Sequence, residues 1–212
     1  MLKGAIFDHD GLMFDTEKVW QKNWDIVADE LGITLPDSFR REICGTSGQL
    51  MIDTIARYFI GADPHYIKTR VSDGVHQDCA KHLDPKPGLD KILEFFHKQG
   101  IPMAVASSSP IELLHNNLRN AGIDHYFDVV VSGQQIEHGK PAPDIFLLAA
   151  EKLGIDPKEC YVFEDAYNGV RAGVAAGCYT IMIPDMLQPN EEMKKIASAI
   201  YHDLGEAADN LN

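Results

Sequence analysis

Basic residues are scarce in this 212-residue chain, which has 19 lysines and arginines against 32 aspartates and glutamates. The formal net charge at pH 7 is therefore −13. A nucleic-acid partner requires a basic surface that neutralises its phosphates, so the composition argues against nucleic-acid binding. The same deficit means that an anionic ligand such as a phosphate would need local positive charge, from a placed lysine or from a metal ion.

Cysteine is also sparse, and long apolar runs are missing. Cys44, Cys79, Cys160 and Cys178 lie far apart and form no CxxC pair, which favours free thiols over disulfides or zinc. No stretch reaches the roughly 20 apolar residues of a membrane span. The short apolar run near the first residue is not followed by the cleavage site of a signal peptide. We therefore expect a cytoplasmic protein that binds no membrane.

The chain has no internal repeat and no low-complexity segment, and its 45% hydrophobic and 24% charged residues are ordinary for a globular protein. Short apolar runs rich in β-branched and aromatic residues predict buried strands. They are residues 4–7, 102–106, 128–131, 160–163 and 179–183.

Helical patterns lie between most of these predicted strands. Residues 89–99 place apolar side chains at the spacing of one helical face and end at Gly100, as is typical of a helix C-terminus. Residues 111–121 and 145–153 repeat the pattern, each followed by a glycine. The alternation of strands and helices predicts an α/β fold with a doubly wound parallel sheet and helices on both faces.

One interval interrupts this alternation. About ninety residues separate the first two predicted strands, and residues 16–80 show only helical patterns, with amphipathic runs at 19–31 and 50–59. A Pro/Gly-rich stretch at 84–88 closes the interval. We predict a core domain made of residues 1–15 and 85–212, and an inserted α-helical domain made of residues 16–84.

Polar and charged residues follow four of the five predicted strands. In open α/β sheets, ligands bind beyond the carboxyl ends of the strands, so these side chains are expected at one edge. Taken singly, each group could be a helix cap, a turn former or a solvated loop residue. Their convergence favours a functional site. The residues are Asp8 and Asp10, Ser107, Ser108 and Ser109, Lys140, and Glu164 and Asp165.

The pattern of these groups fits phosphate-ester chemistry. Hydrolysis of phosphate monoesters is among the slowest uncatalysed reactions, with accelerations up to about 10²¹, so a nucleophile, fixed positive charge and oriented donors must combine. Asp8 is predicted to be the nucleophile. Asp10 lies two residues further on, and an extended backbone aims both carboxylates to the same side, so Asp10 is predicted to be the general acid and base. His9 points the other way and is interpreted as structural.

The remaining groups complete the predicted site. Mg²⁺ prefers carboxylates, water and phosphate oxygens, so we predict a magnesium site. Its expected ligands are the carboxylates of Asp8, Glu164 and Asp165 and the main-chain carbonyl of Asp10.

Three further residues are expected to contact the phosphate. Lys140 is predicted to pair with Asp8 and with the phosphate. The hydroxyl of Ser107 and the main-chain N–H of Ser108 are predicted to hold the remaining phosphate oxygens.

These motifs resemble the haloacid dehalogenase-like hydrolase superfamily, in the branch that contains phosphoglycolate phosphatase, small sugar phosphatases and β-phosphoglucomutase. The resemblance covers nearly the whole chain and implies a Rossmann-like core with a helical cap that closes over the substrate. It also implies the roles given above and Mg²⁺ as the cofactor. The motifs are residues 7–11 with 15–17, then 106–109, then 140–144, then 163–165 with Gly169 and Gly173.

The predicted substrate contacts extend beyond the acidic groups. In the core, Gly11 and Ser109 join Ser108 in contacting the phosphate. In the inserted domain, a second group is predicted to face the site and to set specificity, although its two tryptophans have the alternative of packing in that domain's interior. This group is Trp20, Trp24, Gly45, Thr46 and Ser47.

Departures from the relatives narrow the choice of activity. Dehalogenases of the superfamily lack the second acidic residue of the first motif, so Asp10 favours phosphoryl chemistry. The phosphonatases carry a Schiff-base lysine in the cap, which has no obvious counterpart here. β-Phosphoglucomutase presents a histidine and a phosphate-binding arginine from its cap, where this chain has Trp20 and Gly48. We therefore expect a phosphatase for a small sugar or polyol phosphate, with a phosphosugar mutase as the alternative.

Two other classes of protein share part of the pattern. A signalling receiver module also combines acidic strand ends, Ser/Thr and Lys on a doubly wound sheet, but it has no inserted domain and needs no Asp8/Asp10 pair on one strand. A catalytically dead binding protein would not need all of the expected groups. The expected partner is a small phosphorylated metabolite, and the expected assembly is a monomer or a weak homodimer.

Overall fold

The computed structural model describes residues 2–44, 46 and 48–211. The chain divides into two compact units. The first, here called the core unit, comprises Met1–Asp15 and Leu83–Asn212. The second, here called the helical unit, is Thr16–His82.

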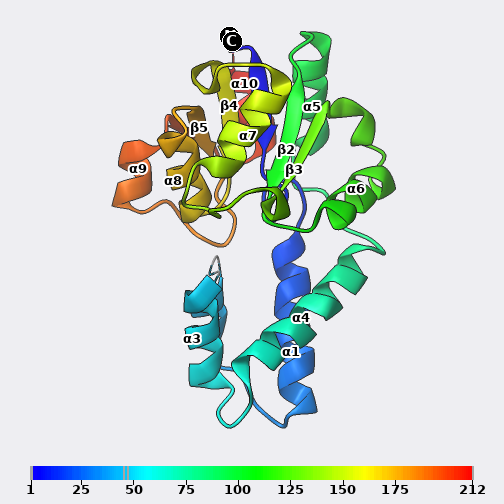
Figure 1. The fold of residues 1–212 in the computed structure, drawn as a ribbon, viewed down its shortest axis with the longest axis vertical. Coiled ribbons are helices and arrows are strands. Elements are labelled where there is room, and N and C mark those ends of the chain that lie inside the picture. Colours follow the sequence, from blue (N-terminus) through cyan, green and yellow to red (C-terminus); the bar gives the residue numbers. More distant parts are fainter. Residues whose placement is uncertain (1, 45, 47, 212) are drawn as a thin grey trace. The chain divides into compact units, whose positions relative to one another are not determined.

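The core unit contains a six-stranded parallel sheet with the order β3-β2-β1-β4-β5-β6 (Figure 1). This confirms the predicted doubly wound α/β fold. The sixth strand was not predicted, because two residues are too few to form a pattern. The strands are β1 (Gly4–Phe7), β2 (Met103–Ser107), β3 (Val129–Ser132), β4 (Cys160–Glu164), β5 (Tyr179–Met182) and β6 (Ala199–Ile200).

Helices connect these strands. Three of them agree to within one residue at each end with the ranges predicted from apolar periodicity: α5 (Leu89–Lys98), α6 (Ile111–Asn120) and α7 (Asp144–Leu153). The other α-helices of the core unit are α8 (Tyr167–Ala175), α9 (Glu191–Ile196) and α10 (Leu204–Asn210).

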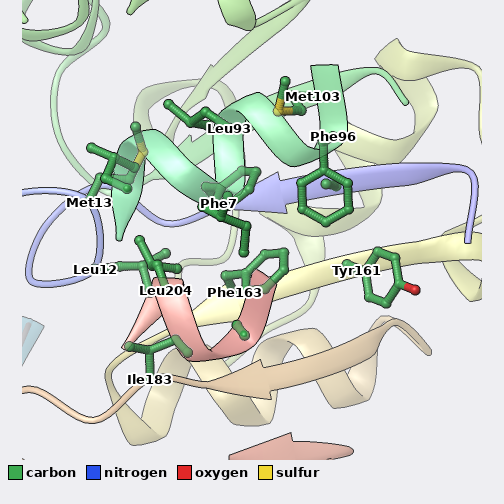
Figure 2. Close-up of a cluster of buried hydrophobic side chains, with 14 of the residues drawn as sticks. Phe7, Leu12, Met13, Leu93, Phe96, Met103, Tyr161, Phe163, Ile183 and Leu204 are labelled. Atoms are coloured by element: carbon green, nitrogen blue, oxygen red, sulfur yellow. The ribbon is translucent and has the colours of Figure 1, made fainter. Parts of the chain in front are cut away.

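Apolar side chains, with several aromatic rings among them, fill the layer between one face of the sheet and α5 and α10 (Figure 2). Phe7 of β1 stacks on Phe163 of β4, with ring centroids 4.7 Å apart, and Phe96 of α5 meets both rings edge-on. Since successive residues of a strand face opposite sides, Ile6 and Val162 point to the other face, where they pack with α7 and α8. This double-sided burial fixes the strand register, and with it the positions of the residues that follow β1 and β4.

The helical unit has its own apolar interior. Trp24 is 2% exposed and its ring contacts those of Phe39 and Phe59, at centroid distances of 5.4 and 6.1 Å. Trp24 therefore packs in the interior of the helical unit, which was the alternative to its facing the site. The helices of this unit are α1 (Thr16–Glu30), α2 (Asp37–Ile43), α3 (Gly48–Tyr58) and α4 (Pro64–Cys79). None of the helices in the described parts of the chain is long and apolar enough to cross a membrane.

Close backbone contact between α5 and α10 makes Gly88 sensitive to substitution. Gly88 has a φ of 79°, and a Cβ atom there would lie 2.0 Å from the backbone nitrogen of Gly205. Gly100, just beyond the other end of α5, has a similar φ of 65° but no atom within 4 Å of an added Cβ. We expect Gly88→Ala to lower the free energy of unfolding by about 2–5 kcal/mol, the sum of left-handed strain and overpacking.

Gly100→Ala is the matched control, because it carries the left-handed strain alone and should cost about 1–2 kcal/mol. Urea denaturation of both variants measures the difference. Equal losses would show that the α5–α10 approach adds nothing to the cost at Gly88.

Candidate active site

The loop after β1 places two acidic residues at the carboxyl edge of the sheet. The backbone N–H of Asp8 donates to the carbonyl of Phe163, 3.0 Å away, so the loop begins in register with β4. A tight turn follows, in which the carbonyl of His9 accepts from the N–H groups of Met13 and Phe14. The side chain of Asp8 is 8% exposed, whereas that of Asp10 is 32% exposed. The two carboxylates therefore have different access to a ligand.

Lys140 joins the acidic groups of two strands. Its Nζ lies 2.5 Å from Oδ1 of Asp8 and 2.5 Å from Oε1 of Glu164, and it also donates to the carbonyl of Ala106 at 3.3 Å. The Lys140 side chain is 10% exposed and its ammonium lies 5.0 Å from the ring centroid of Phe146. The alternative of a solvated loop lysine is therefore excluded by the structure.

Three carboxylates form a cluster that could hold a metal ion. Asp8, Glu164 and Asp165 each offer an oxygen, and these oxygens lie within 4.8 Å of one another. Burial, together with the charges of Glu164 and Asp10, raises the pKa of Asp8 to about 7 in spite of the opposing charge of Lys140. Burial and the charges of Glu164 and Asp8 also raise the pKa of Asp165 well above its usual range.

The charge of the cluster is suited to a divalent cation. Burial would lower the pKa of Lys140, but the charges of Asp8 and Glu164 outweigh it and raise that pKa. One lysine faces three carboxylates, so the cluster lacks positive charge when all three are ionised. Mg²⁺ prefers this set of oxygen ligands, and such an ion would relieve the repulsion among the carboxylates, which adds to burial in raising the pKa values of Asp8 and Asp165.

Asp10 belongs to a separate hydrogen-bonded group. Its Oδ2 accepts from the hydroxyls of Ser107 and Ser109, at 2.9 and 2.8 Å. Ser107 Oγ was expected to face the phosphate, and in this structure it donates to Asp10. Burial would raise the pKa of Asp10, but the electrostatic contact with His9 and the two serine hydroxyls hold that pKa well below its usual range.

The structure revises the interpretation of His9. We expected its side chain to point away from the carboxylates. The ring is fully buried, but its Nδ1 lies 3.3 Å from Oδ1 of Asp10. The turn that follows bends the backbone out of the extended form on which that expectation depended, so periodicity could not have found this contact.

The other predicted residues of the core unit lie close to this edge. Gly11 is buried beside Asp165, and a Cβ at Gly11 would be 2.4 Å from Oδ2 of Asp165. Ser108 is exposed between the two serines that contact Asp10. Gly169, which belongs to the motif around residue 164, leaves the space that the Glu164 carboxylate occupies, since an added Cβ would lie 1.9 Å from it.

The predicted specificity residues lie in the helical unit. Trp20 is half-buried on α1, with its ring 6.2 Å from that of Trp24, and the hydroxyl of Thr46 donates to the carbonyl of Ile43 at 2.6 Å. Gly45 and Ser47 lie outside the described residues. That this group faces the substrate stays a prediction.

Sequence reasoning missed one ion pair near the cluster. Lys86 Nζ lies 2.6 Å from Oδ1 of Asp185, with side chains 19% and 18% exposed. Asp185 contributes to the raised pKa of Asp165. The two partners are 99 residues apart in the sequence, and neither belongs to a recognisable motif, so no signal in the sequence connects them.

Fold and site together define a Rossmann-like α/β protein with an acidic centre at the carboxyl edge of its parallel sheet. Residues 5–183 match the haloacid dehalogenase-like hydrolase family, and the chain belongs to this family. The resemblance identified from the sequence motifs is confirmed.

Curated relatives of the chain include several phosphatases. Fructose-1-phosphate phosphatase YqaB of Escherichia coli (strain K12) is 33% identical over 175 residues, covering 82% of this chain and 92% of the relative. Hexitol phosphatase B of the same strain is 31% identical over 209 residues, covering 95% and 92%.

Among solved structures, a putative β-phosphoglucomutase from Thermotoga maritima has a TM-score of 0.79 at 29% identity, covering 98% of this chain and 97% of that one. CbbY from Rhodobacter sphaeroides in complex with xylulose-(1,5)bisphosphate has a TM-score of 0.81 at 23% identity, with both chains fully covered, and shares the fold.

The raised pKa of Asp8 has a consequence for stability. Between its ordinary value of 3.8 and about 7, the folded metal-free protein keeps a proton on Asp8 that the unfolded chain has released. The free energy of unfolding therefore falls as pH rises through this range. Because Asp8→Asn removes this titration, its stability relative to wild type should be greater at about pH 8 than at about pH 4.

Urea denaturation in the presence of a chelator, at both pH values, measures this effect. If the stability difference between Asp8→Asn and wild type were the same at both pH values, burial and repulsion at Asp8 would not have the predicted effect.

Proposed function

We propose that this hydrolase is a Mg²⁺-dependent phosphatase that transfers the phosphoryl group of a small sugar or polyol phosphate to Asp8 and then to water. The observation that carries the proposal is the position of Asp8, whose carboxylate contacts Lys140 beside the carboxylates of Glu164 and Asp165. The family membership supports hydrolysis of phosphoric monoesters, and the named activities of the relatives support a phosphorylated sugar as the substrate.

Two steps account for hydrolysis. In the first, an Asp8 oxygen attacks phosphorus, the bond from phosphorus to the ester oxygen breaks, and the leaving oxygen takes a proton from the Asp10 carboxyl. In the second, water attacks the phosphorus of the acyl-phosphate while the Asp10 carboxylate takes its proton. The bond from phosphorus to Asp8 then breaks, which regenerates the Asp8 carboxylate and releases inorganic phosphate.

Fixed groups of the chain orient this chemistry. Lys140 holds Asp8 and supplies positive charge beside the transferred phosphoryl group. Ser108, exposed in the loop after β2, offers its backbone N–H to a phosphate oxygen, and Ser107 and Ser109 hold the Asp10 carboxylate.

The proposed metal site uses the carboxylates of Asp8, Glu164 and Asp165, with the main-chain carbonyl of Asp10 as a further ligand. When bound, Mg²⁺ would neutralise these carboxylates and withdraw charge from the phosphoryl oxygens. Burial, and after it the charges of the neighbouring carboxylates, raise the pKa values of Asp8 and Asp165, and a bound cation would favour the ionised form of both groups, which supports this assignment.

A phosphosugar mutase is the second candidate, because a putative β-phosphoglucomutase shares the fold along nearly the full chain at 29% identity. Such a mutase has to hold a second phosphate group. The position assigned to its phosphate-binding arginine corresponds to Gly48, which begins α3 and has no side chain to contribute. The phosphatase is therefore favoured.

The first test is phosphate release from fructose 1-phosphate, hexitol phosphates and other small phosphomonoesters with Mg²⁺ present. Wild type should release phosphate. Asp8→Asn should reduce the rate by about 10³-fold or more, because loss of a nucleophile removes the covalent route. The exposed Asp29→Asn variant on α1 is the control and should keep the wild-type rate.

A near-normal rate in Asp8→Asn would contradict the covalent mechanism. Absence of release from every compound by wild type, with isomerisation of a sugar phosphate that depends on a bisphosphate activator, would establish the mutase instead.

The second test concerns the metal. A chelator should stop phosphate release and added Mg²⁺ should restore it, because the clustered carboxylates need a cation. Independently of activity, Mg²⁺ should raise the melting temperature of wild type more than that of Asp165→Asn, which lacks one predicted ligand charge. Full activity in chelator, or equal thermal shifts in both proteins, would contradict the assigned metal site.

A further inference from the structure

A buried polar pair lies behind the loop that carries the two aspartates. His9, which lies between Asp8 and Asp10 in the sequence, has a fully buried side chain, and Asn117 on α6 is 3% exposed. The amide nitrogen of Asn117 lies 3.4 Å from Nε2 of His9. An amide nitrogen can only donate, so Nε2 accepts and the ring proton of a neutral His9 resides on Nδ1.

The nitrogen that carries this proton faces Asp10. Nδ1 lies 3.3 Å from Oδ1 of Asp10, close enough for its N–H dipole to act on the carboxylate, although among the described residues it makes no hydrogen bond of standard geometry. The other carboxylate oxygen, Oδ2, is held by Ser107 and Ser109. His9 thus contacts Oδ1 of Asp10, the carboxylate oxygen that the two serines do not bind.

Burial of this polar pair is energetically unfavourable. Asn117 occupies the apolar face of α6 beside Leu114 and Leu118, and within the described chain its Oδ1 has no hydrogen-bond partner. An unpaired buried polar atom has lost its hydrogen bonds to water without replacing them, which destabilises the folded protein. A leucine at this position would fill the same face without that cost, which points to a function for the amide.

We propose that His9 and Asn117 are positioning residues that fix the orientation of the Asp10 carboxylate for proton transfer. Asn117 fixes the ring and the tautomer of His9, and His9 fixes Oδ1 of Asp10. The inference rests on the proposed function, in which Asp10 protonates the leaving oxygen. Displacement of a reacting group by about 1 Å can cost roughly 10²-fold in rate, so a support behind Asp10 affects the transfer step without touching the substrate.

The test compares two substrates that differ in their need for an acid. A sugar phosphate has a poor leaving group and needs a proton from Asp10, whereas p-nitrophenyl phosphate has a good leaving group and does not. His9→Leu should lower kcat/KM for the sugar phosphate about tenfold, a part of the roughly 10²–10⁴-fold that general-acid catalysis supplies. It should lower kcat/KM for p-nitrophenyl phosphate much less.

Further variants separate positioning from packing. His9→Asn retains an N–H group near the position of Nδ1 and should recover most of the sugar-phosphate rate. Asn117→Leu should show the same substrate-dependent loss as His9→Leu, and the double variant should be no worse than His9→Leu alone, because the pair acts as one unit. His115→Leu, an exposed histidine on the same helix, is the control and should match wild type.

The outcomes distinguish this inference from the function on which it rests. Asp10→Asn should show a larger loss for the sugar phosphate than for p-nitrophenyl phosphate, and equal losses would contradict the acid role of Asp10 itself. If Asp10→Asn behaves as expected but His9→Leu and Asn117→Leu lose rate equally on both substrates, or lose none, the positioning role is wrong. If His9→Leu does not fold, the losses of kcat/KM on the two substrates are compared for His9→Asn and Asn117→Leu instead, and they test the positioning role.

Discussion

The contact of Lys140 with Asp8 and Glu164 is the interaction on which the site depends. The lysine comes from the loop before α7, while Asp8 directly follows β1 and Glu164 ends β4. Two carboxylates buried this close together would repel each other, and the shared ammonium offsets that repulsion. The same contact fixes the loop to the sheet edge. One side chain therefore both offsets the repulsion between the carboxylates and holds its own loop in place.

Much of this arrangement could be predicted from the sequence, because it follows from local rules. Five strands were predicted from short apolar runs and three helices of the core unit from apolar periodicity, and parallel strands bring their carboxyl ends to one edge. That rule alone predicted that Asp8, Lys140, Glu164 and Asp165 would meet, and the structure brings them together. The sixth strand has only two residues, and its existence depends on pairing with β5 rather than on its own pattern.

What the sequence could not predict depends on tertiary contacts between segments with no shared motif. The pair of Lys86 and Asp185 forms because a linker after the helical unit meets the loop after β5. His9 looked structural under an extended backbone, and only the turn after Asp10 brings its ring to the carboxylate. Contacts of this kind depend on backbone bends and helix placement, which periodicity does not encode.

The different environments of the two aspartates explain how neighbouring carboxyls can have different tasks. In the metal-free protein, burial and repulsion favour the protonated form of Asp8, whereas His9 and the serine hydroxyls favour the ionised form of Asp10. Asp10 must nevertheless carry a proton to act as an acid. A phosphate dianion beside it would raise its pKa, because like charges disfavour ionisation. Proton uptake by Asp10 would then accompany substrate binding, and the hydrogen bonds that stabilise its carboxylate would favour the base role once the leaving group has departed.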